Sequence, residues 1–111
     1  MPTERTAGTR SMAELRTVIY LRGTDSGQLD DAEQRCGAYA QRFGWQIMGS
    51  VRDGNDDGEL KRLLRNVREL GIEIIMTGNL DMISPEPSVR DELMAAIERR
   101  QCIVQPVGIA V

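Results

Sequence analysis

The stretch TVIYLRGTDSG, residues 17–27, decides the fold of this chain. It opens with a run of β-branched, aromatic and apolar residues, which is typical of a short strand buried inside a sheet. The run stops at Gly23, and the residues from there to Gly27 are those of a loop. The stretch therefore predicts a buried first strand at residues 17–21, followed by a loop at residues 23–27.

The residues that follow extend this pattern to the end of the chain. Apolar side chains recur at three- and four-residue steps from Leu29 to Phe43, with Asp30 and Asp31 near the positive end of the helix and Gly44 placed to cap its C-terminus. Further apolar runs then alternate with helical periods. We expect helices at residues 29–43, 59–70 and 88–100, and strands at residues 17–21, 45–51, 72–77 and 102–107.

Strands that alternate with helices of this length need right-handed crossovers, and such crossovers produce a parallel sheet covered on both faces. We therefore predict an α/β fold of three layers, in which helices flank a four-stranded, mainly parallel sheet. Residues 17–111 are expected to form this domain. Residues 1–16 show no period, so we expect a flexible N-terminal arm there.

Composition excludes several classes of protein. The chain has 111 residues, enough for one domain, and it contains neither an apolar run of the roughly 20 residues that cross a bilayer nor a secretory signal. We expect a cytoplasmic protein without membrane contact. Histidine is absent, and Cys36 and Cys102 lie far apart, so we expect reduced thiols, no metal and no cofactor.

The net charge and the arginine content point to different kinds of binding partner. A net charge of −3 argues against a non-specific DNA binder, yet 13 of the 14 basic residues are arginine, which holds phosphate and carboxylate groups well. Arg62, Arg65 and Arg68 are spaced to form one stripe on a helix. This stripe is typical of a solvated face, and a contact with nucleic acid or an acidic partner is the alternative.

Several short motifs occur in a fixed order. They are Tyr20-x-Arg22-x-Thr24, Gln34, Gly44-Trp45, Asp53, Leu63-Leu64 and Leu80-Asp81-x-x-Ser84. In this order and spacing the chain resembles the N-terminal catalytic domain of serine recombinases, the resolvase/invertase family, over residues 17–107. The resemblance implies a resolvase-like fold. It also implies, for an active member, a serine that attacks a DNA phosphodiester and arginines that hold the phosphate without a metal.

The sequence departs from that family where the chemistry is expected. Thr24 stands at the nucleophile position, and of the expected arginines only Arg22 is retained. Met82 and Pro85 replace two of the others, and Asp57 stands where the resemblance expects the remaining one. We therefore predict a degenerate domain that is not an enzyme, with Arg22 and Thr24 as vestigial catalytic residues.

Other interpretations of the same residues remain open. The candidates for phosphate binding are Tyr20, Arg22, Ser26, Asp81 and Ser84. They could form a phosphate or nucleotide-binding module with the loop at residues 23–27, or an ordinary strand end at which Arg22 pairs with Asp53 or Asp81. A further alternative is an active DNA strand transferase that uses Thr24 as its nucleophile.

The resemblance also suggests how an inactive domain would act. Serine recombinases work as dimers and tetramers, and we expect this chain to lack their long helix and DNA-binding domain. We therefore expect protein association and weak or absent DNA binding. The partner would be a second copy or an intact recombinase. An apolar tail from Val104 to Val111 could form the contact, or it could pack back on its own sheet.

Overall fold

The computed structural model describes residues 15–108, which form alternating strands and helices. The elements are β1 (Arg16–Arg22), α1 (Ser26–Phe43), β2 (Gln46–Asp53), α2 (Gly58–Leu70), β3 (Ile74–Thr77), the 3-10 helix η2 (Leu80–Met82), α3 (Pro87–Arg99) and β4 (Ile103–Pro106). The strands lie in the order β2-β1-β3-β4, and each neighbouring pair is parallel. The predicted α/β fold with a four-stranded parallel sheet is confirmed.

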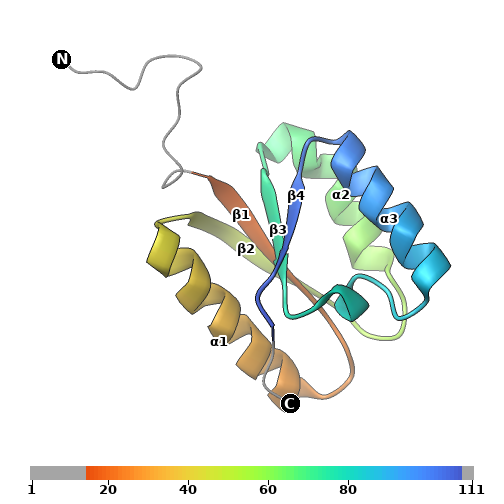
Figure 1. The fold of residues 1–111 in the computed structure, drawn as a ribbon, viewed down its shortest axis with the longest axis horizontal. Coiled ribbons are helices and arrows are strands. Elements are labelled where there is room, and N and C mark those ends of the chain that lie inside the picture. The colour runs from red at the N-terminus through yellow and green to blue at the C-terminus, as the bar shows by residue number, and fades with distance from the viewer. Residues whose placement is uncertain (1–14, 109–111) are drawn as a thin grey trace.

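The sheet separates two apolar cores. Figure 1 shows α1 on one face of the sheet and α2 with α3 on the other. β1 supplies both cores because successive side chains of a strand point to opposite faces: Val18 and Tyr20 join the α2–α3 core, and Ile19 and Leu21 join the α1 core. The apolar run of β1 is thus explained by its central place in the sheet.

The ends of the helices follow from local chemistry. Gly44 and Gly71 cap α1 and α2 with φ angles of 73° and 70°, a conformation that glycine adopts without strain. The predicted start of α1 was wrong, because the Asp25 carboxylate accepts a hydrogen bond from the Gln28 amide and the helix begins at Ser26. Asp30 and Asp31 consequently lie beyond the first turn.

The N-terminal boundary also needs correction. Arg16 was expected in the arm, but it opens β1, and its Nη1 donates to the Leu70 carbonyl at 2.9 Å. The rest of the expected arm, residues 1–14, and residues 109–111 of the apolar tail lie outside the described residues. Among residues 15–108, no helix is both long and apolar enough to cross a membrane.

We expect two isoleucines in register on neighbouring strands to differ in their effect on stability. Ile74 of β3 is 2% exposed, whereas its partner Ile103 on the edge strand β4 is 62% exposed. Ile74→Ala should lower the free energy of unfolding by about 2–5 kcal/mol, because it leaves a cavity. Ile103→Ala should lower it by less than about 1 kcal/mol. Urea unfolding followed by circular dichroism measures both, and equal losses would contradict this account of the core.

Candidate functional site

The candidate site lies at the edge of the sheet where the strands end. All four strands run in parallel, so Arg22 at the end of β1 and Asp53 at the end of β2 meet at the same edge, which η2 joins after β3. The chain passes from β1 outward to β2 and then back across β1 to β3. Ligands of open α/β sheets bind beside such a reversal, at the carboxyl ends of the strands.

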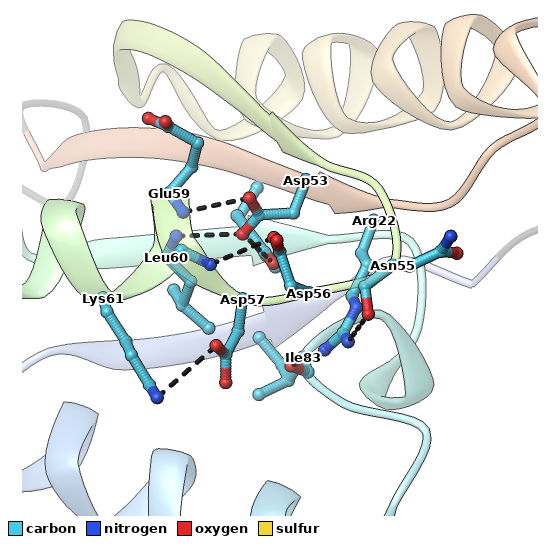
Figure 2. Close-up of polar contacts among 11 residues, drawn as sticks. Arg22, Asp53, Asn55, Asp56, Asp57, Glu59, Leu60, Lys61 and Ile83 are labelled. Atoms are coloured by element: carbon cyan, nitrogen blue, oxygen red, sulfur yellow. Dashed lines mark hydrogen bonds and ion pairs between the residues drawn. The ribbon is translucent and has the colours of Figure 1, made fainter.

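Asp53 is the centre of the polar contacts at this edge. Its side chain is buried, and Figure 2 shows both carboxylate oxygens directed at the first turn of α2. Oδ1 accepts from the Glu59 amide at 2.9 Å, and Oδ2 accepts from the Leu60 amide at 3.0 Å. Asp53 therefore satisfies two amides that the helix cannot pair internally, and its charge lies at the positive end of the helix dipole.

Tyr20 supplies the third hydrogen bond to Asp53. Its hydroxyl donates to Oδ2 at 2.7 Å, and the side chain is fully buried. Burial, followed by this hydrogen bond, raises the pKa of Tyr20 well above its ordinary value of 10. The phenol therefore stays protonated at neutral pH, and its place in the α2–α3 core lets it act as a structural donor to Asp53.

Arg22 links the loop after β2 to the segment after η2. Its Nη2 donates to the Asn55 carbonyl at 2.9 Å, and its Nη1 lies 3.4 Å from the Ile83 carbonyl. The expected pairing of Arg22 with Asp53 or Asp81 was wrong: within residues 15–108 no carboxylate forms a salt bridge with it. The guanidinium instead holds the loop after β2 against the segment after η2.

The two candidate hydroxyls of the first loop lie at the surface. Thr24 and Ser26 are both exposed, on either side of Asp25, which caps α1. Since α1 begins at Ser26, only Gly23 to Asp25 remain of the loop that was expected to extend to Gly27. The connection is therefore a short strand-to-helix turn, and Thr24 is the exposed hydroxyl nearest to Arg22 in sequence.

Asp81 and Ser84 are held by other groups. The Nη1 of Arg90, from α3, lies 2.6 Å from Oδ1 of Asp81 and also contacts the Ser84 carbonyl at 3.3 Å. The buried Ser84 hydroxyl accepts from the Glu86 amide at 3.2 Å, at the start of α3. Arg90 was not among the candidates from sequence, because it belongs to none of the motifs and reaches Asp81 only through the packing of α3.

The positions at which the resemblance expects arginine differ in environment. Met82 is buried in the α1 core, whereas Pro85 is exposed. Asp57 is the residue before α2, and its Oδ1 lies 3.5 Å from Nζ of Lys61, its neighbour one helical turn away. No positive side chain thus replaces the missing arginines at these three positions.

The thiols do not add to the site. Cys36 and Cys102 are both free and buried. Burial, with a smaller contribution from the charge of Glu33, raises the pKa of Cys36 to about 11, and burial also raises the pKa of Cys102. Thiols with raised pKa values are poor nucleophiles at neutral pH. In the described part of the chain, no three acidic or thiol side chains are grouped to hold a metal.

Comparisons with known proteins identify the fold. No protein-family model matches the chain, and no curated protein matches it. Among solved structures, it is similar to the crystal structure of the N-terminal catalytic domain of TP901-1 integrase, with a TM-score of 0.70 and 18% sequence identity. The match covers 81% of this chain and 75% of that one. It confirms the resolvase-like fold and, at this identity, shows the fold alone.

We expect Asp53→Asn to destabilise the domain. An amide side chain has one acceptor oxygen, so at least one of the donors from Tyr20, Glu59 and Leu60 loses its acceptor. The free energy of unfolding should fall by about 1–3 kcal/mol, measured by urea unfolding. Asp31→Asn, in an exposed salt bridge with Arg35, is the control and should change it by less than about 1 kcal/mol. Similar losses in the two variants would contradict the role of Asp53.

Proposed function

We propose that this chain is a catalytically inactive resolvase-like domain that acts by associating with other protein chains, in the regulation of DNA recombination. One observation carries the proposal. At the carboxyl edge of the sheet, three of the four positions expected to hold arginine hold Asp57, Met82 and Pro85, and the remaining arginine, Arg22, contacts backbone carbonyls.

The electrostatics of this edge support inactivity. A phosphodiester under attack gains negative charge, and the loss of one group that stabilises such charge typically slows a reaction about 100- to 1,000-fold. Here three of the four expected arginines are missing, and the loop and first turn of α2 carry Asp56, Asp57 and Glu59 instead. Figure 2 shows Asp57 turned toward Lys61 and the Glu59 side chain directed away from Asp53. Asp57 and Glu59 pair with Lys61 and Arg62, so Asp56 is the carboxylate of this group that adds negative charge against a phosphate.

Two alternatives use the same edge. An active strand transferase would use the exposed hydroxyl of Thr24, which lies in the short turn between β1 and α1. A phosphate-binding module would use Arg22, but two of its guanidinium nitrogens already donate to Asn55 and Ile83. The contacts of Arg22 favour the inactive domain over both, because each alternative needs this group to be directed at a phosphate.

We expect no covalent protein–DNA adduct. The test incubates the protein with a pool of nicked suicide duplexes of random sequence and looks for an adduct that survives denaturing electrophoresis. The expected result is no adduct with the wild type, because phosphoryl transfer lacks its stabilising charges. An adduct that disappears in Thr24→Ala and persists in Ser26→Ala would establish the strand transferase instead.

Exposed apolar residues on and beside the edge strand β2 support the associative part of the proposal. Phe43, Ile47 and Met48, which we call the β2 edge surface, are 45%, 41% and 43% exposed. Phe43 stacks on Trp45 with ring centroids 5.3 Å apart, which holds the apolar side chain in place. In the described sheet β2 pairs with β1 alone, so its outer side has no neighbouring strand. Exposed apolar residues beside such a strand edge commonly mark protein contacts, and a second copy of the chain would bring the same residues.

We expect self-association through the β2 edge surface. Light scattering over a concentration series should show a mass that rises toward twice 12.4 kDa. Ile47→Glu combined with Met48→Glu should return the mass to that of one chain, because each buried carboxylate must be desolvated. Leu70→Glu with Leu80→Glu is the control at exposed apolar residues elsewhere. A mass of 12.4 kDa at every concentration of wild type would contradict self-association.

A further inference from the structure

A groove of about 590 Å³ lies between the C-terminal half of α2 and the end of α3. Its lining residues are Leu64, Arg65, Arg68, Arg99 and Arg100. α2 leads into β3 and α3 leads into β4, so the groove is at the edge where these strands begin. Figure 1 shows the two helices on the same face of the sheet. The groove therefore lies at the opposite end of the strands from Arg22, and it shares no residue with the candidate site.

Positive charge is concentrated in this arginine groove. Four of its five lining residues are arginine, and none is acidic. In the described part of the chain, Arg65, Arg68 and Arg99 form no salt bridge. Each helix C-terminus contributes about half a negative charge, so the two helix ends offset only about one of the four positive charges. The residues that line the groove therefore keep a net positive charge.

One arginine is fixed in position, and the others are exposed around it. Nε of Arg100 donates to the Leu64 carbonyl at 2.9 Å, and its Nη1 donates to the Ala96 carbonyl at 2.8 Å. These bonds join α2 to α3 and hold the guanidinium in place, with three of its five N–H groups not used by them. Arg65, Arg68 and Arg99 are exposed and can adjust to a ligand.

We propose that the arginine groove binds a carboxylate-rich segment of a partner protein. Guanidinium groups pair with carboxylates through two parallel hydrogen bonds, and a short segment would occupy only the basic groove. A DNA duplex covers a wider surface, about 600–1,000 Å² even for a small module. It would reach the neighbouring groove along α3, which Asp91 and Glu98 line, on a chain whose net charge is −3. The surrounding charge therefore favours an acidic peptide over nucleic acid.

The test measures binding of a fluorescein-labelled peptide of glutamates to the full chain by fluorescence anisotropy. Wild type should bind it, and added salt should weaken binding, because exposed charges are screened. Arg68→Glu combined with Arg99→Glu should weaken binding at least about tenfold. The matched control is Arg42→Glu combined with Arg62→Glu, two exposed arginines outside the groove, and it should weaken binding less than about threefold.

Three results would overturn the proposal. They are no binding of the peptide to wild type, an equal loss in the two double variants, and tighter binding of a labelled DNA duplex than of the peptide. The last result would assign the groove to nucleic acid. Circular dichroism of each variant separates lost binding from lost folding. Because the adduct test concerns the other edge of the sheet, failure there leaves this result unchanged.

Discussion

The buried carboxylate of Asp53 is the interaction on which the arrangement of this domain most depends. β2 is an edge strand, and Asp53 is its one fully buried residue. Through this side chain the strand is joined to Tyr20 of β1 and to the first turn of α2. A buried carboxylate is costly unless its oxygens accept hydrogen bonds, and here three donors from two other elements satisfy it. Asp53 therefore fixes the start of α2 relative to the ends of β1 and β2.

The charged groups at the carboxyl ends of the strands make structural contacts as well. In this fold the edge is the usual place for a ligand, yet its two central charged groups act within the protein. Asp53 caps a helix, and Arg22 holds together the segments that follow β2 and η2. Arg90 likewise pairs with Asp81 instead of extending into solvent. Residues that belong to a catalytic motif in one protein can thus serve stability in another with the same fold.

The sequence predicts the fold well because the fold rests on local patterns. The apolar run of β1 and the capping glycines after α1 and α2 are each recognised from a short stretch of neighbouring residues. The candidate site was less predictable. Arg22 donates to backbone carbonyls, and every residue has a carbonyl, so no pattern marks Asn55 and Ile83 as its acceptors. Arg90 reaches Asp81 from another element, and such a contact depends on tertiary packing that a spacing rule cannot show.

Acidic side chains lie near the carboxyl ends of the strands, and arginines lie near the ends where β3 and β4 begin. The helix dipoles account for only some of these charges. α2 begins beside Asp57 and Glu59 and has Arg68 in its last turn, so side-chain charges oppose the helix dipole at both ends. One positive side chain at each helix C-terminus is enough to oppose the dipole. The arginine groove holds two from each helix region, and one of them, Arg100, is anchored by carbonyls of both helices. This excess over what the dipoles require is the physical reason to look for an acidic partner at that edge.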